Sequence, residues 1–200
     1  MKLLLFSDLH CDASAAASLV HRSRGVDAVV CAGDLANCRR RLSVCVDVLR
    51  AITCPTILVP GNNESFDELA AACRDWPGAR ELHGAGTTIG GIEFYGLGGG
   101  IPTTPFGDWS FDFTEQEAAE LLAGCPKGGV LISHSPPKGA VDVASNGKSL
   151  GSTAVRAAIK RVQPALVVCG HIHASAGQTA MIGTTTVINA GPGGMEWNLS

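Results

Sequence analysis

The sequence LVVCGHIH, residues 166–173, decides the fold. Its first four residues are apolar, which is typical of a buried strand. The strand ends at Gly170, and His171 and His173 follow directly. In extended backbone, residues two apart point the same way, so both imidazoles are expected to converge on one point. Open α/β sheets bind ligands at this edge, and two nitrogen ligands there indicate a metal site. The alternative is a pair of ordinary polar loop residues.

The composition is that of a globular protein without a basic surface. The chain has 200 residues, of which 46% are hydrophobic and 16% charged, so residues 1–200 can bury one core and are expected to form a single domain. The net charge of −3 disfavours nucleic-acid polymers and anionic membranes as partners. No apolar stretch approaches the length of a membrane span, so no membrane partner is expected.

Eight cysteines raise the question of a disulfide framework. They form no C-x-x-C pair, and several lie in apolar runs such as residues 29–32. Buried, reduced thiols are the simpler interpretation and are typical of a reducing compartment. The apolar run at residues 3–6 is too short for a signal peptide. We therefore expect a cytoplasmic protein.

The first 75 residues alternate strands with helices. Strands are expected over residues 2–7, 27–32 and 56–59, and helices over 12–24, 37–52 and 65–75. This alternation predicts a mostly parallel sheet, with a polar group after every strand.

The second half is mixed. Hairpin strands are expected at residues 87–89 and 92–95, further strands at 129–133, 166–169, 179–182 and 185–189, and helices at 114–124 and 153–162. Thr114 and Glu117 have the spacing of a capping box, and Ser152 is a second candidate N-cap.

Polar side chains follow five of the expected strands. These residues are Asp8 and His10, Asp34, Asn62, His134, and then His171 and His173. Each fragment alone is more typical of a turn or a cap. Five fragments that each follow a buried strand indicate a common site.

This ordered set resembles the motifs of the calcineurin-like metallophosphoesterases. The family pattern is D-x-H, G-D, G-N-H-[D/E], a histidine near a strand end, and G-H-x-H. In this chain it stands as residues 8–10, 33–34, 61–64, 134 and 170–173. The chain looks most similar to small bacterial and archaeal members with a His-Ser-Pro-Pro segment. The resemblance implies an α/β fold, a four-layer α/β/β/α sandwich with two metal ions at the strand ends.

The resemblance also implies a ligand set. One metal would take Asp8, His10 and His173, the other would take Asn62, His134 and His171, and Asp34 would bridge both. The catalytic residues would be Asp34, Asn62, Asn63 and His134. Carboxylate, amide and imidazole ligands suit divalent Mn²⁺ best, with Fe, Zn²⁺ or Ni²⁺ as alternatives. Two ions about 3.5–4 Å apart would clamp the phosphoryl group and activate a bridging hydroxide that attacks phosphorus.

One position departs from the family pattern. The histidine of G-N-H is replaced by Asn63, which donates a hydrogen bond but cannot transfer a proton near neutral pH. Relatives that lack this histidine are often better phosphodiesterases than monoesterases. The resemblance therefore implies a phosphodiesterase whose partner is a small phosphoester substrate. Glu64 in the same motif has either a functional or a purely structural role.

Three residues are candidate substrate contacts, namely Asn63, Arg39 and Trp109. Arg39 begins a run of three arginines after the Gly-Asp motif, where it either reaches a substrate phosphate or lies on a solvated helix face. Trp109 belongs with Phe106 and Phe111 to the loop 99–111, whose aromatic rings either stack on a nucleobase or pack under the loop. Phe111 is assigned to the core.

Two other functions are compatible with the motifs. Some proteins of this fold are non-catalytic scaffolds, although here all seven ligand positions hold ligand-capable residues. A nuclease acting on polymeric nucleic acid is the second alternative, and the acidic charge balance disfavours it. A homodimer is also an open expectation.

Overall fold

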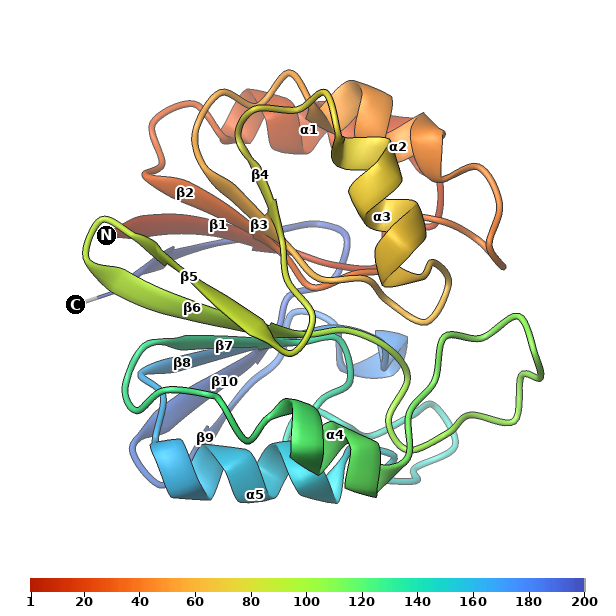
Figure 1. The fold of residues 1–200 in the computed structure, drawn as a ribbon, viewed down its shortest axis with the longest axis vertical. Helices are drawn as coiled ribbons and strands as arrows, with labels where there is room; N and C mark the ends of the chain where they lie inside the picture. The colour runs from red at the N-terminus through yellow and green to blue at the C-terminus, as the bar shows by residue number, and fades with distance from the viewer. Residues whose placement is uncertain (200) are drawn as a thin grey trace.

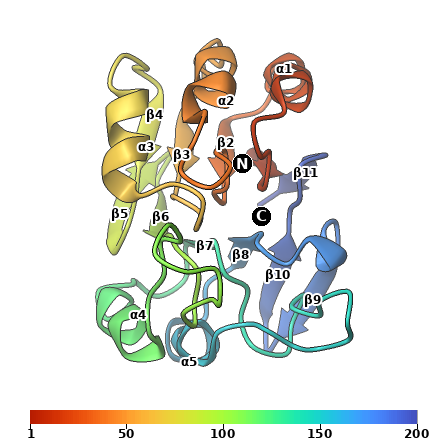
Figure 2. The same ribbon diagram turned by 90° about the vertical axis from the view of Figure 1, so that its right-hand side faces the viewer.

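Two β-sheets face each other, and helices cover the outer face of each sheet (Figures 1 and 2). The structure is a computed structural model, and it describes residues 1–199. The layers follow one another as helices, sheet, sheet and helices. The expected α/β fold, a four-layer α/β/β/α sandwich, is confirmed.

The first sheet contains the N-terminal strands and the last strand of the chain. Its strand order is β11-β1-β2-β3-β4. The strands are β1 (Lys2–Phe6), β2 (Ala28–Cys31), β3 (Thr56–Leu58), β4 (Ala79–Glu81) and β11 (Met195–Asn198). Strands β1 to β4 are parallel, and β11 pairs with β1 in the antiparallel sense.

The second sheet has the order β5-β6-β7-β8-β10-β9. Its strands are β5 (Ala85–Ile89), β6 (Ile92–Leu97), β7 (Val130–Ser133), β8 (Leu166–Cys169), β9 (Thr179–Ile182) and β10 (Thr185–Asn189). The four central strands are parallel, and an antiparallel partner closes each edge. The C-terminal ends of the central strands therefore share one edge of the sheet.

Within the described residues 1–199, five α-helices form the two outer layers. The first sheet is covered by α1 (Ala13–Arg22), α2 (Leu42–Leu49) and α3 (Phe66–Cys73), and the second by α4 (Glu115–Leu121) and α5 (Thr153–Val162) (Figure 2). Within residues 1–199, no helix is long and apolar enough to cross a membrane.

Burial on both faces explains why the strands read as continuous apolar runs. In β1, Leu3 and Leu5 belong to the hydrophobic cluster between the sheets, whereas Leu4 and Phe6 belong to the cluster under the helices of the first sheet. All four side chains are fully buried. Alternating residues of a strand point to opposite faces, so a strand covered on both sides needs apolar residues throughout.

The predicted helix starts are confirmed where a side chain caps the backbone. Thr114 and Glu117 form a capping box at α4, and the Ser152 side chain accepts a hydrogen bond from the backbone of Val155 at the start of α5. These caps satisfy backbone N–H groups that have no partner inside the helix.

The helix predicted over residues 37–52 was wrong at its start, because α2 begins only at Leu42. Residues 37–41 form a turn in which Cys38 and Arg39 have left-handed φ values of 48° and 62°. The Arg39 backbone N–H donates to the Asn63 carbonyl at 2.9 Å. This long-range contact overrides the helical spacing of the apolar residues.

Two short strands do not appear in the sequence pattern. Strand β4 has three residues, and β11 lies in the tail, where Trp197 pairs opposite Leu3 of β1. Trp197 therefore packs on the body of this chain. Both strands lie at edges of the first sheet, where a few backbone pairings suffice and the apolar pattern is weak.

Candidate metal centre

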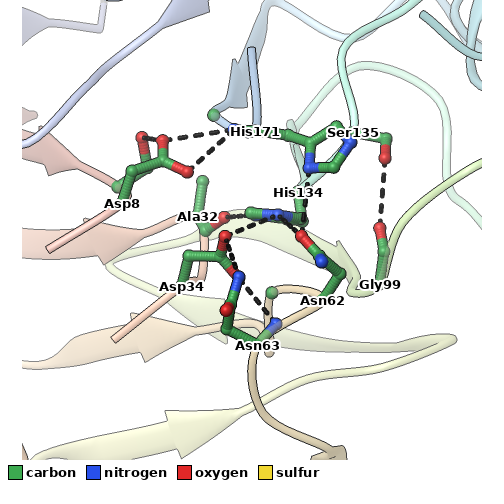
Figure 3. Close-up of polar contacts among 12 residues, drawn as sticks. Asp8, Ala32, Asp34, Asn62, Asn63, Gly99, His134, Ser135 and His171 are labelled. Carbon is green, nitrogen blue, oxygen red and sulfur yellow. Dashed lines mark hydrogen bonds and ion pairs between the residues drawn. The ribbon is translucent and has the colours of Figure 1, made fainter. Parts of the chain in front are cut away.

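The seven candidate ligands follow the C-terminal ends of strands from both sheets. Figure 3 shows five of them close together, namely Asp8, Asp34, Asn62, His134 and His171. Six of them form two groups whose potential ligand atoms all lie within 4.8 Å of one another. The first group is Asp8, His10 and His173, and the second is Asp34, His134 and His171. The first group spans 165 residues of the chain, from 8 to 173, and the second spans 137, from 34 to 171.

Asp34 lies between the two groups. Its Oδ2 atom is 3.6 Å from His10 Nε2 and 3.5 Å from His134 Nε2. One carboxylate thus faces an imidazole of each group, which is the position that a bridging ligand requires.

Asn62 joins the second group through its side-chain oxygen. Asn62 Oδ1 lies 3.3 Å from His134 Nε2 and 3.1 Å from His171 Nδ1 (Figure 3). An amide oxygen has lone pairs and can bind a divalent cation, whereas the amide nitrogen cannot.

Backbone carbonyls fix the tautomers of two histidines. His134 Nδ1 lies 2.7 Å from the Ala32 carbonyl, and His10 Nδ1 lies 3.2 Å from the Ala36 carbonyl. A carbonyl only accepts, so Nδ1 carries the proton in each ring and Nε2 presents a lone pair to the centre. His10 Nε2 is 3.0 Å from His173 Nε2, so one cation could bind both nitrogens. The donor set therefore fits divalent metal ions.

The extended geometry predicted for His171 and His173 was wrong. His171 has a left-handed φ of 65°, and His173 begins a short 3₁₀ helix, η1 (His173–Ser175). The two imidazoles consequently point to different groups instead of converging on one point.

Four candidate ligands have left-handed backbone conformations that residues other than glycine rarely adopt. These are Asp8, His10, Asp34 and His171, with φ between 45° and 65°. Such conformations cost about 1 kcal/mol or more each and persist only where surrounding contacts hold them. Here the ligand loops hold one another, since the Asp8 N–H donates to Gly33 O and the His10 N–H donates to Asp34 O.

Motif glycines make room for the carboxylates. A Cβ atom at Gly61 would overlap the Asp34 carboxylate, and one at Gly170 would overlap the carboxylate of Asp8. These glycines are therefore required by close approach, since any larger residue displaces a candidate ligand.

The two carboxylates have different environments. Burial opposes ionisation of Asp8, but hydrogen bonds from His173 and Ser7 and the charge of His134 lower its pKa to about 2. Burial raises the pKa of Asp34 above its ordinary value, against the opposing effect of His134. A bound cation favours the ionised form of both groups.

The two histidines of the second group, His134 and His171, also differ in their pKa values. Burial and the neighbouring His134 lower the pKa of His171 to about 3, so this ring is neutral at physiological pH. Burial alone would lower the pKa of His134, but the carboxylates of Asp34 and Asp8 raise it. Only a neutral imidazole can bind a metal ion, so a proton on His134 competes with the metal.

Asn63 lies against Asp34. Its backbone N–H donates to Asp34 Oδ1 at 2.9 Å, and its side-chain Nδ2 donates to Asp34 Oδ2 at 2.8 Å. Its Oδ1 accepts from the Cys38 N–H at 2.8 Å. The side chain is buried and orients the candidate bridging carboxylate, while its role as a substrate contact stays a prediction.

Arg39 and Trp109 lie next to each other beside the Asn62–Asn63 segment. Arg39 Nε forms an ion pair with Glu68 at 2.6 Å, and its Nη1 donates to the Trp109 carbonyl at 3.4 Å. The Trp109 ring stacks on the exposed ring of Phe106, with centroids 5.7 Å apart. Their roles as substrate contacts also stay predictions.

Phe111 packs in a separate aromatic cluster with His83 and Phe113. The His83 ring lies 5.4 Å from Phe111 and 4.9 Å from Phe113, between ring centroids. His83 Nδ1 accepts from the Gly98 N–H at 3.2 Å. This half-buried histidine therefore supports the loop that follows β6.

Glu64 has a larger role than the sequence indicated. Its side chain is fully buried and accepts hydrogen bonds from four backbone N–H groups, those of Gly61, Asp34, Leu35 and Ala36, at 2.8–3.3 Å. It thus ties together the two loops that carry Asp34 and Asn62. Its position in the family motif was the only available signal.

Two further polar residues support the ligands and carry no recognisable sequence signal. Ser7 Oγ donates to Asp8 Oδ2 at 2.5 Å. Asn189 Nδ2 donates to the carbonyls of Gly170 and Ile172 on either side of His171, at 3.1 and 3.0 Å. Both residues come from strand ends that only the tertiary structure brings to the centre.

Solved structures share this architecture. A protein of Thermus thermophilus superimposes with a TM-score of 0.76 at 21% identity, covering 100% of this chain and 99% of that one. A dimetal phosphatase from Danio rerio superimposes with a TM-score of 0.64 at 15% identity, covering 94% and 86%. At these identities the likeness shows the fold alone.

Sequence comparison adds the family. The chain is 34% identical over 138 residues to human metallophosphoesterase domain-containing protein 1, a match that covers 66% of this chain and 39% of that protein. The match thus spans about two fifths of the length of this relative. The family model of the calcineurin-like phosphoesterase superfamily domain matches residues 1–199. With the paired donor groups at the strand ends, this match shows that the chain belongs to the calcineurin-like phosphoesterase superfamily.

Proposed function

We propose that this chain is a phosphodiesterase that uses two divalent metal ions, most favourably Mn²⁺, to hydrolyse small phosphodiesters. The observation that carries the proposal is the position of Asp34, whose Oδ2 lies within 3.6 Å of an imidazole nitrogen from each donor group. Two bound ions would supply Lewis acidity and a hydroxide at neutral pH.

The residues around the centre suit this chemistry. One ion would be held by Asp8, His10 and His173. The other ion would be held by Asn62, His134 and His171, and Asp34 would bind both. The protons on His10 Nδ1 and His134 Nδ1 are held by backbone carbonyls, so both Nε2 atoms are available as ligands.

The proposed preference for diesters rests on Asn63. An amide cannot supply a proton to a leaving group, and the family resemblance implies that members without this histidine favour diesters over monoesters. The test is hydrolysis of bis-p-nitrophenyl phosphate and p-nitrophenyl phosphate by Mn²⁺-reloaded protein. We expect faster turnover of the diester, and equal or faster turnover of the monoester would contradict the proposed specificity.

Asn63→His is expected to raise monoester turnover relative to diester turnover by about 10-fold or more, because general acid catalysis contributes about 10²–10⁴-fold. The measurement is the ratio of kcat/KM values for the two aryl phosphates. Asn63→Gln is the matched control, since it changes size without adding a titratable group. An unchanged ratio in Asn63→His would show that Asn63 does not set the preference.

Trp109→Ala is expected to raise KM about 10-fold for a diester that carries a nucleobase, because stacking on an aromatic ring contributes about 1–3 kcal/mol. Thymidine 5′-p-nitrophenyl phosphate provides the base, and methyl p-nitrophenyl phosphate is the comparison without it. Trp109→Phe, which keeps an aromatic plane, serves as the control. If KM rises equally for both substrates, or for neither, Trp109 does not contact the base.

The cysteine content of the chain bears on the location of the proposed enzyme. All eight cysteines are free thiols, which supports the proposed cytoplasmic location.

The two alternative functions predict different results. A non-catalytic scaffold would bind metal without turnover of either phosphate, and a nuclease would bind polymers with a steep salt dependence. The net charge of −3 favours a small substrate over a polymer.

A further inference from the structure

The loop between β6 and α4 carries polar side chains that reach the candidate metal centre. This loop is clamped to the segment after β3, since the Phe111 N–H donates to the Asn62 carbonyl at 2.9 Å and the Gly99 N–H donates to the Pro60 carbonyl at 3.1 Å. Asn62 Nδ2 then donates to Ser110 Oγ at 2.9 Å. The loop therefore contacts both the backbone and the side chain of a candidate ligand.

The hydroxyl of Ser110 has a second partner, Asp112. Ser110 Oγ lies 2.8 Å from Asp112 Oδ1, while Thr104 donates to Asp112 Oδ2 from its backbone N–H at 2.8 Å and from its hydroxyl at 2.6 Å. The Asp112 carboxylate is thus held in place by two donors from Thr104.

The hydrogen bonds along this chain of groups have one consistent direction. An ionised carboxylate only accepts, so the single proton of Ser110 is directed to Asp112. The Ser110 oxygen then accepts a hydrogen bond from Asn62. Only the NH₂ group of the Asn62 amide can donate this bond. The amide oxygen must face the opposite way, where it lies 3.3 Å from His134 Nε2 and 3.1 Å from His171 Nδ1.

We infer that Ser110 and Asp112 are positioning residues that fix the amide of Asn62 with its oxygen toward the second donor group. The inference rests on the proposed function, because only the amide oxygen can bind a metal ion. If the amide turned over, it would present N–H groups to a cation and to the ring nitrogens. Residues that orient a ligand in this way typically change metal affinity by about 10–100-fold.

The experiment is a calorimetric titration of metal-free protein with Mn²⁺. Ser110→Ala is expected to lower the affinity of one of two Mn²⁺ sites by about 10–100-fold and to leave the other unchanged. Asp112→Asn is expected to do the same, because the new amide can donate to Ser110 and turn the hydroxyl proton toward Asn62. Ser110→Thr keeps the hydroxyl and is expected to restore binding.

Ser145→Ala is the matched control, because it removes an exposed hydroxyl from another loop. The melting temperature of each metal-free variant is recorded alongside. Wild-type affinity at both sites in Ser110→Ala would overturn the inference and leave the proposed function intact. A lower melting temperature with unchanged Mn²⁺ affinity would assign Ser110 to folding alone and overturn it as well. Failure of the wild-type protein to bind two ions would contradict the proposed function itself.

Discussion

The His171→Ala variant is expected to lose at least about 10³-fold in kcat/KM for bis-p-nitrophenyl phosphate. His171 is a half-buried, neutral imidazole whose Nδ1 lies 3.1 Å from Asn62 Oδ1 in the second donor group. Its removal leaves that group with fewer ligands, and a bound metal contributes several kcal/mol of transition-state stabilisation. Since each 1.36 kcal/mol corresponds to tenfold in rate, a loss of about 4 kcal/mol gives this factor.

The measurement compares wild-type protein, His171→Ala and His21→Ala, each stripped with a chelator and reloaded with Mn²⁺. His21 is an exposed histidine in the last turn of α1, so its replacement controls for the loss of an imidazole. Wild-type turnover should disappear with the chelator and return with Mn²⁺. Turnover that persists in His171→Ala, or in stripped wild-type protein, would contradict the dinuclear mechanism. Metal uptake without turnover in the wild-type protein would favour the scaffold.

The Glu64→Ala variant is expected to lower the free energy of unfolding by at least about 3 kcal/mol. Glu64 is fully buried and accepts from four backbone N–H groups in the two loops around Asp34 and Asn62. A buried donor left without a partner costs about 1–3 kcal/mol, and this substitution removes the acceptor of all four. Left-handed conformations such as that of Asp34 also lose their support.

Urea unfolding of metal-free protein measures this effect without any contribution from bound ions. Glu64→Gln is the informative comparison, because its oxygen can replace Oε1 while its NH₂ group faces the Ala36 N–H that Oε2 accepts at 2.9 Å. The expected loss of unfolding free energy in Glu64→Gln is smaller, about 1–3 kcal/mol. Glu120→Ala, on an exposed face of α4, is expected to change stability by less than about 0.5 kcal/mol. A Glu64→Ala variant as stable as this control would show that water replaces the carboxylate at no cost.

The positions of most strands along the chain, and the polar residues that follow them, were predictable from sequence. Apolar runs such as residues 166–169 and 28–31 identify strands buried on both faces, and the alternation with helices predicts parallel pairing. Parallel strands have their C-terminal ends at the same edge. Asp8 and Asp34, which follow neighbouring strands of the first sheet, could therefore be expected to meet, whereas His134 follows a strand of the second sheet and joins them only through the packing of the two sheets.

The local geometry of the ligands could not be predicted in the same way. The strand pattern alone predicted that His171 and His173 point to one site, whereas a left-handed φ at His171 accompanies their division between two groups, as the family resemblance implied. The helix expected from residue 37 begins at Leu42, because the Arg39 backbone is held by Asn63. Positive φ values at non-glycine residues are set by tertiary contacts, which no local periodicity records.

The sequence by itself determined which segments are buried strands and which donor residues follow them, because a run of apolar side chains is a local property that places each strand end. The two-sheet sandwich was implied by the family resemblance. The division of these donors into two groups was implied by the family resemblance, and only the tertiary structure shows its geometry, with Asp34 facing an imidazole of each group. The tertiary structure also decided that Glu64 ties the ligand loops together and that Ser110 orients Asn62. These contacts depend on directional hydrogen bonds, most of them between residues far apart in the chain, that form only after the sheets have packed.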